Sequence, residues 1–317
     1  MKNSILNSIG NTPMVEINID GYRFMAKMEC MNPFGSMKDR AAFTVLKNLL
    51  DIHTINQDTT VIESSSGNFA IALSGVCATM NMKCICVVDN NITRTNQQII
   101  EQYGSKIIKI DTPEKDQSNQ EKRIETVNQI LKSHKNIYWT NQYDNSLIQE
   151  SYFNLAKEIL TQCPNVEQIF IPVSTCGTIA GVSTWIKKHK SDVKIIAVDS
   201  YGSKIFGSRI TRNRFTGIGS IIKPGNLKNA LIDKVIRVTD YECLLNCHSL
   251  IKQGLLVGAS SGAVVAAIKK SKGSHKNIIA IFPDRGDRYL NNLFCQDWID
   301  KNLSELLKEE DIISSLT

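Results

Sequence analysis

The chain lacks any apolar run close to the ~20 residues that a membrane-spanning helix requires. Residues 1–10 also lack the apolar centre of a secretory signal peptide. Neither membrane insertion nor export is therefore indicated. We expect a cytoplasmic protein with no membrane partner.

The sequence also lacks the cysteine pattern of a disulfide-bonded or zinc-binding protein. Its nine cysteines are an odd number at scattered spacings, which suits a reducing compartment. Cys84 and Cys86 would share one face of a strand, whereas Cys243 and Cys247, followed by His248, would lie along a helix. Neither group has the second pair of ligands that a zinc site needs, so no metal is expected.

Signals for nucleic-acid and nucleotide binding are missing as well. The net charge of +6 comes from 37 basic and 31 acidic residues, which form no basic stripe with interleaved aromatics. No Gly-Lys-Ser/Thr phosphate loop is present, and Gly-Ile-Gly at 217–219 is too short for a dinucleotide fingerprint. We therefore expect no nucleic-acid partner.

What the chain has is a regular alternation of strand-like and helix-like runs. The strand-like runs are 60–62, 84–88, 106–110, 169–173, 194–198 and 277–282, and the helix-like runs are 70–80, 95–103, 122–132 and 180–190. Short, doubly apolar strands joined by helices predict right-handed βαβ units, and therefore an α/β fold with mostly parallel sheets. A polar cluster at 141–145 is the best candidate for a linker.

Lys38 is the first candidate functional residue. It lies in Asn-Pro-Phe-Gly-Ser-Met-Lys-Asp-Arg at 32–40, directly before a helix-like stretch. A lysine in such a loop is usually only solvated. Three polar segments at the ends of strand-like runs favour a functional role for this lysine. They are Glu-Ser-Ser-Ser-Gly-Asn at 63–68, Pro-Val-Ser-Thr-Cys-Gly-Thr at 172–178 and Gly-Ala-Ser-Ser-Gly at 258–262. Because ligands gather at the carboxyl ends of strands in open α/β sheets, these segments are candidates to converge on one crevice.

The segment 174–178 is a candidate phosphate site. It offers three hydroxyl side chains and a glycine just before a predicted helix. Backbone amides at a helix N-terminus hold a phosphate dianion well, although a plain N-cap is the alternative. A phosphate site, a loop lysine and no nucleotide motif together indicate pyridoxal 5′-phosphate, whose aldehyde condenses with a lysine amine.

These segments resemble the cysteine synthase branch of the fold type II pyridoxal-phosphate enzymes over nearly the whole chain. The matching motifs lie at 11–14, 32–40, 65–68, 141–143, 174–178, 217–219, 258–262 and 283–289. The resemblance implies a tryptophan synthase β-like fold of two three-layer αβα domains with the cofactor cleft between them. Residues 1–34 plus 146–317 would form the larger cofactor-binding domain, residues 35–145 would form a smaller mobile domain, and the protein would be a homodimer.

The resemblance also implies roles for single residues. Lys38 would be the catalytic lysine that carries the cofactor, Asn68 would hydrogen-bond the ring hydroxyl, and Ser260 would face the pyridine nitrogen. The cofactor phosphate would be held by Ser174, Thr175, Cys176, Gly177 and Thr178. A neutral hydroxyl does not stabilise a protonated pyridine as an aspartate would, which favours β-elimination or β-replacement over transamination.

The substrate side departs from ordinary cysteine synthases. The residues implied to bind the substrate carboxylate are Ser65, Ser66, Gly67 and Gln142. Ser174 and Cys176 stand where glycines are usual, and Tyr143 stands where a phenylalanine is common. Together with Val-Val-Asp at 87–89, these departures are similar to the siderophore-pathway enzymes that make N-(2-amino-2-carboxyethyl)-L-glutamate, the precursor of 2,3-diaminopropionate.

The implied reaction is a β-replacement that joins O-phospho-L-serine to L-glutamate with release of phosphate. Arg123 matches an arginine of that subfamily and is a candidate to bind the glutamate carboxylate or to close the site. The alternative is a solvated helix arginine. Two rival functions stay open: a cysteine synthase that uses O-acetylserine or O-phosphoserine with sulfide, and a catalytically idle cofactor-binding regulator. The intact Lys38, Asn68 and Ser260 favour an enzyme.

Overall fold

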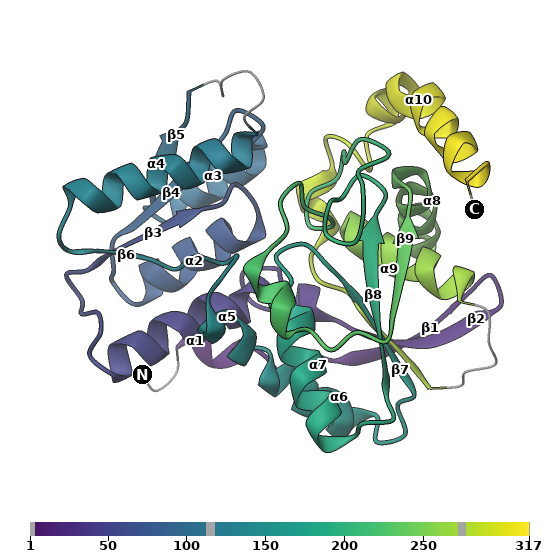
Figure 1. The fold of residues 1–317 in the computed structure, drawn as a ribbon, viewed down its shortest axis with the longest axis horizontal. Helices are drawn as coiled ribbons and strands as arrows, with labels where there is room; N and C mark the ends of the chain where they lie inside the picture. The colour runs from purple at the N-terminus through teal and green to yellow at the C-terminus, as the bar shows by residue number, and fades with distance from the viewer. Residues whose placement is uncertain (1–3, 112–117, 272–276, 317) are drawn as a thin grey trace.

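The computed structural model describes residues 4–111, 118–271 and 277–316, and its strands form two sheets (Figure 1). The smaller sheet has the order β5-β4-β3-β6 and consists of β3 (Thr60–Ser64), β4 (Cys84–Val88), β5 (Lys106–Lys109) and β6 (Ile137–Trp139). The larger sheet has the order β1-β2-β10-β7-β8-β9 and consists of β1 (Met14–Ile19), β2 (Tyr22–Lys27), β7 (Gln168–Pro172), β8 (Lys194–Ser200), β9 (Lys234–Val238) and β10 (Ile278–Ile281).

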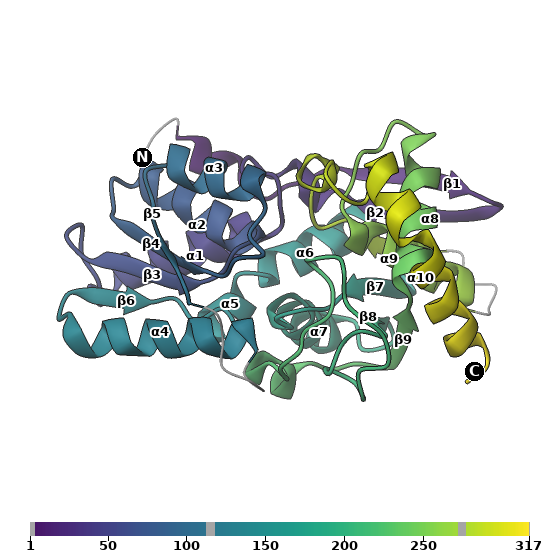
Figure 2. The same cartoon turned by 90° about the horizontal axis from the view of Figure 1, so that it is seen from above.

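Helices cover both faces of each sheet (Figures 1 and 2). They are α1 (Lys38–Asp51), α2 (Asn68–Thr79), α3 (Arg94–Gln102), α4 (Asn119–Ser133), α5 (Ser146–Glu150), α6 (Phe153–Gln162), α7 (Gly177–His189), α8 (Asp240–Ile251), α9 (Ala259–Lys270) and α10 (Gln296–Ser314). In the smaller sheet, α2 and α4 lie on opposite faces, and in the larger sheet α7 and α9 do so.

Strand β7 shows why the sheets are buried on both sides. Ile169 and Ile171 belong to the core shared with α6 and α7, whereas Phe170 belongs to the core shared with α8 and α9. Since successive side chains of a strand point to opposite faces, an unbroken apolar run requires two covering layers. The described strands pair in parallel except for β1 with β2. The expected α/β fold of two three-layer units with mostly parallel sheets is therefore confirmed.

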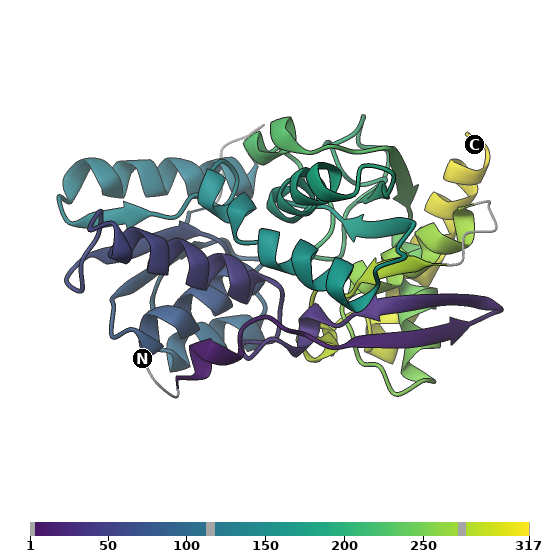
Figure 3. The same cartoon turned by 90° about the horizontal axis from the view of Figure 1, so that it is seen from below.

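An antiparallel hairpin of β1 and β2 was not expected from the sequence. It forms one edge of the larger sheet and reaches outward, away from the smaller sheet (Figure 3). Its turn is Asp20-Gly21, with φ angles of 51° and 83°. Asp-Gly is favoured there because both positions of such a two-residue turn need positive φ. Strands β6 and β9 and helices α5, α6 and α10 were also missed.

Cys84 and Cys86 are buried on β4, within the core under α2, as their spacing predicted. The domain boundaries at 34/35 and 145/146 stay a prediction, although the smaller sheet lies wholly between them. Within the described ranges, no helix combines the length and the apolar character needed to span a bilayer.

Gly181 marks the closest approach of two helices. A Cβ atom on Gly181 in α7 would lie 2.0 Å from the backbone oxygen of Gln149 in α5. Glycine to alanine inside a helix normally stabilises by about 1 kcal/mol. Here we expect Gly181→Ala to lower the free energy of unfolding by about 3 kcal/mol, because backbone atoms must move apart. Denaturant titration beside Lys188→Ala, an exposed position on the same helix, measures this. A variant as stable as the wild type would contradict the contact.

Candidate active site

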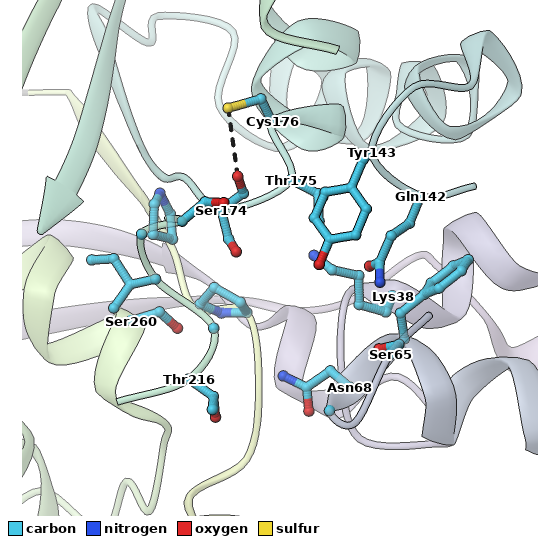
Figure 4. A pocket seen from close by; sticks show the side chains of 18 of the residues that line it. Lys38, Ser65, Asn68, Gln142, Tyr143, Ser174, Thr175, Cys176, Thr216 and Ser260 are labelled. Atoms are coloured by element: carbon cyan, nitrogen blue, oxygen red, sulfur yellow. Dashed lines mark hydrogen bonds between the residues drawn. The ribbon is translucent and has the colours of Figure 1, made fainter. Parts of the chain in front are cut away.

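The main candidate site is a cavity of about 300 Å³ lined by segments that are far apart in the chain (Figure 4). The lining includes residues at or just after the ends of β3, β7 and β10, which places the cavity at the carboxyl ends of strands from both sheets. The expected convergence of polar segments is therefore observed. From the predicted set, the cavity is lined by Lys38, Ser65, Ser66, Gly67, Asn68, Arg123, Gln142, Tyr143, Ser174, Thr175, Cys176, Thr178 and Ser260.

Lys38 is the first residue of α1, and its side chain points into the cavity (Figure 4). The preceding loop is closed by Asp39, whose carboxylate accepts a 2.6 Å hydrogen bond from the Phe34 backbone. Burial lowers the pKa of Lys38 to about 8, against the opposing effect of the Asp284 carboxylate. An uncharged amine is the form that attacks an aldehyde or takes a proton, so this position suits a reactive lysine.

The loop before α7 turns sharply into the helix at Cys176. This residue has a φ of 60°, in the left-handed region, and its thiol donates a 3.8 Å contact to the Ser174 carbonyl. The first N–H groups of a helix have no partner within the helix, and the helix dipole adds partial positive charge there. Thr175 and Thr178 add hydroxyls on buried residues that line the cavity. Gly177 starts the helix with Ile148 packed behind it and does not line the cavity.

A buried carboxylate lies behind two of the predicted cofactor residues. Asp284 is fully buried, and its carboxylate accepts hydrogen bonds of 2.7 Å from the Asn68 amide and 3.3 Å from the Ser260 hydroxyl. The Tyr289 hydroxyl donates a third, of 2.7 Å. Asp284 lies in the matching motif at 283–289, but its role was not predicted from the sequence.

Arg123 is a further residue of the cavity lining. Its guanidinium donates to the Asp89 carboxylate, and its Nε lies 3.4 Å from the Ser64 hydroxyl. The side chain is only 11% exposed, so the alternative of a solvated helix arginine is wrong. The Tyr143 hydroxyl contacts both Arg123 and Gln120, and burial raises the pKa of Tyr143 although the arginine opposes this.

Arg209 is a second arginine at the cavity, and it was not predicted from the sequence. It is an exposed residue of the lining, and its Nε donates a 2.9 Å hydrogen bond to the Thr211 carbonyl. The segment that carries it has no helix or strand between β8 and the short helix at Gly225–Asn229. Hydrophobic periodicity gives no signal in such a segment, so nothing in the sequence pattern pointed to Arg209.

Comparison with known proteins decides the family. Residues 5–284 match the family model described as pyridoxal-phosphate dependent enzyme. The chain belongs to this family. It is 30% identical to an O-acetylserine dependent cystathionine β-synthase from Helicobacter pylori, with a TM-score of 0.85 over 92% of this chain and 98% of that chain.

Two further solved structures are similar to this pyridoxal-phosphate enzyme. O-acetylserine sulfhydrylase isoform 3 from Entamoeba histolytica is 27% identical, with a TM-score of 0.85 over 93% of this chain and 92% of that chain. O-ureido-L-serine synthase is 24% identical, with a TM-score of 0.83 over 93% and 95%, and this likeness shows the fold alone. The protein is thus a pyridoxal-phosphate-dependent transferase of the cysteine synthase-like, β-replacement type.

The cavity fits that cofactor. A phosphate needs donors without competing anions, and the start of α7 supplies amides and threonine hydroxyls. An aldehyde needs an uncharged amine, and the pKa of Lys38, lowered by burial to about 8, brings that form within reach near neutral pH in the same cavity. A pyridine ring needs polar groups at its edge, and Asn68 and Ser260 lie on the cavity wall.

Proposed function

We propose that the protein joins O-phospho-L-serine to L-glutamate by β-replacement, giving N-(2-amino-2-carboxyethyl)-L-glutamate and phosphate. One observation carries this proposal. Besides the residues suited to the cofactor, the cavity holds the guanidinium of Arg123 and the hydroxyls of Tyr143 and Ser174, with Arg209 also in its lining. A dicarboxylate nucleophile and a phosphorylated donor need such groups, whereas sulfide needs none.

The cofactor is proposed to be held by Lys38, Asn68, the segment 174–178 and Ser260. When bound, it supplies the electron sink that allows the Cα proton and the Cβ substituent of the donor to be lost. Ser65, Ser66, Gly67 and Gln142 are proposed to bind the donor carboxylate. The start of α2 directly after this loop suits an anion, because it presents free backbone N–H groups.

Lys38 is proposed to move the protons of the reaction. Its Nζ takes the proton from Cα, and phosphate leaves from Cβ with the electron pair of the C–O bond. The new bond joins Cβ to the glutamate nitrogen, which must first lose a proton to solvent because an ammonium has no lone pair. Lys38 then returns its proton to Cα. A pKa of about 8 leaves Lys38 able to hold and release a proton near neutral pH.

The loop 174–178 should determine how tightly the cofactor is held. If Thr175 and Thr178 bind the cofactor phosphate, replacing both with valine should weaken cofactor retention by at least about 100-fold, because each charge-assisted hydrogen bond is worth about 1.5 to 3 kcal/mol. The measurement is cofactor occupancy after dialysis. Thr184→Val, at an exposed position on the same helix, is the control. Unchanged occupancy in the double variant would remove this loop from the site.

A sulfur nucleophile is the second candidate. The 30% identity to the Helicobacter pylori protein, whose name specifies cystathionine synthesis from O-acetylserine, favours it. The test supplies O-phosphoserine or O-acetylserine with glutamate, sulfide or homocysteine, and identifies each product by mass. We expect the glutamate adduct from O-phosphoserine. Cysteine or cystathionine as the main product would replace the proposal with the second candidate.

The biological setting is part of the proposal. The product would serve as the precursor of 2,3-diaminopropionate for siderophore assembly, the enzyme would work in the cytoplasm as a homodimer, and residues 35–145 would form its mobile smaller domain. Analytical ultracentrifugation of the purified protein tests the dimer.

A further inference from the structure

We propose that Arg288 and Asp284 clamp the Asn68 side chain so that its amide nitrogen offers a hydrogen-bond donor to the cavity, which favours the deprotonated ring oxygen of the bound cofactor. This inference rests on the proposed place of Asn68 at the cofactor ring. It concerns two residues that act through Asn68, so they are positioning residues.

Both ends of the Asn68 amide have fixed partners. Its Oδ1 accepts a hydrogen bond from Nη1 of Arg288, and its Nδ2 donates a 2.7 Å hydrogen bond to Oδ2 of Asp284. A guanidinium can only donate and a carboxylate can only accept. A flipped amide would set Nδ2 against the guanidinium and Oδ1 against the carboxylate, so only one orientation satisfies both partners.

The clamp is itself held in place by the surrounding structure. Asp284 is fully buried and is also bonded by the Tyr289 and Ser260 hydroxyls. A Cβ atom at Gly258 would lie 2.1 Å from Oδ1 of Asp284, so a glycine at this position leaves room for the carboxylate. Arg288 is held by a second bond, from its Nη2 to the Phe34 carbonyl.

The Asn68 amide nitrogen keeps one hydrogen for a ligand. Nδ2 carries two hydrogens, and the hydrogen bond to Asp284 uses one of them. Asn68 lines the cavity, and its Oδ1 is already bound to the Arg288 guanidinium, so the second hydrogen on Nδ2 is the group that we propose it offers to a ligand there. A donor stabilises an anionic oxygen and disfavours the neutral hydroxyl, which would itself need an acceptor. The clamp therefore selects the protonation state of the ring oxygen before any substrate binds.

The absorption spectrum of the holoenzyme at one fixed pH tests this, because the two protonation states of the ring oxygen absorb in different bands, visible and near-ultraviolet. We expect Arg288→Gln and Asp284→Asn each to lower the visible to near-ultraviolet ratio by about tenfold, since each releases one end of the amide. Arg285→Gln is the matched control, an exposed arginine on the same segment that should leave the ratio unchanged.

Asn68→Ala separates the proposed place of Asn68 at the cofactor ring from its proposed clamping by Arg288 and Asp284. An unchanged spectrum in Asn68→Ala would remove Asn68 from the ring and overturn the proposed cofactor site. A changed spectrum in Asn68→Ala together with wild-type spectra in both Arg288→Gln and Asp284→Asn would overturn the clamp alone. Melting temperatures show which variants fold. If Asp284→Asn, at a buried position, does not fold, Arg288→Gln alone tests the clamp. A wild-type absorption ratio in Arg288→Gln would then overturn it.

Discussion

Lys38→Ala is expected to abolish covalent retention of the cofactor and to lower kcat by about 10⁴-fold, because one amine both carries the cofactor and moves the substrate proton. Lys38 is the only lysine that lines the cavity among the described residues. Reduction with borohydride followed by peptide mass analysis should find the cofactor on residue 38 of the wild type. Lys47→Ala, an exposed lysine on the same helix, should retain the adduct. An adduct that persists in Lys38→Ala would assign the cofactor to another lysine.

The lowered pKa of Lys38 predicts that cofactor capture and apoprotein stability depend on pH. Burial lowers its pKa from 10.5 to about 8, which means that the folded protein loses this proton before the unfolded chain does. The apoprotein should therefore capture the cofactor faster as pH rises to about 8 and then level off. The lysine's contribution to apoprotein stability should increase as pH rises from about 8 toward 10.5, because the unfolded state binds more protons in that window. A capture rate that keeps rising to 10.5 would show an unperturbed amine.

Arg123→Gln is expected to raise the KM for glutamate by about 10- to 100-fold while the KM for O-phosphoserine changes little, because a carboxylate loses a charge-assisted hydrogen bond. The single change also leaves the buried Asp89 without its cation, which costs stability. The double variant Arg123→Gln, Asp89→Asn removes both charges and separates recognition from folding. Lys122→Gln, at the preceding residue, is the control. An unchanged KM for glutamate in the double variant would exclude Arg123 from its recognition.

Much of the fold could be predicted because its signals are local. Strands such as β4 and β7 are short, buried on both faces and followed by helices, so each βα unit is visible within about 30 residues. The hairpin was missed although Asp20-Gly21 is a strong turn signal. Strand β6 has only three residues, and the apolar run of β9 is interrupted by Arg237, so neither gave a long apolar run.

Site residues could be predicted where their signal lies within one segment of the chain. They could not be predicted where their role depends on partners far away in the sequence. Lys38 and the loop 174–178 carry their signals locally, as a lysine before a helix and as hydroxyls at a helix start. The contact of Asn68 with Asp284 joins residues 216 positions apart. Arg123 and Asp89 meet only because β4 and α4 pack together. Such pairs depend on the tertiary fold, which residue spacing alone does not determine.

A competition between nucleophiles tests the central claim most directly. The protein, loaded with its cofactor, is given O-phosphoserine with glutamate and sulfide at equal concentrations, and the ratio of the two amino-acid products is measured by mass. The account predicts that N-(2-amino-2-carboxyethyl)-L-glutamate predominates, and that Tyr143→Phe with Ser174→Gly shifts the ratio toward cysteine. Cysteine as the predominant product of the unmodified protein would contradict the account and identify a cysteine synthase.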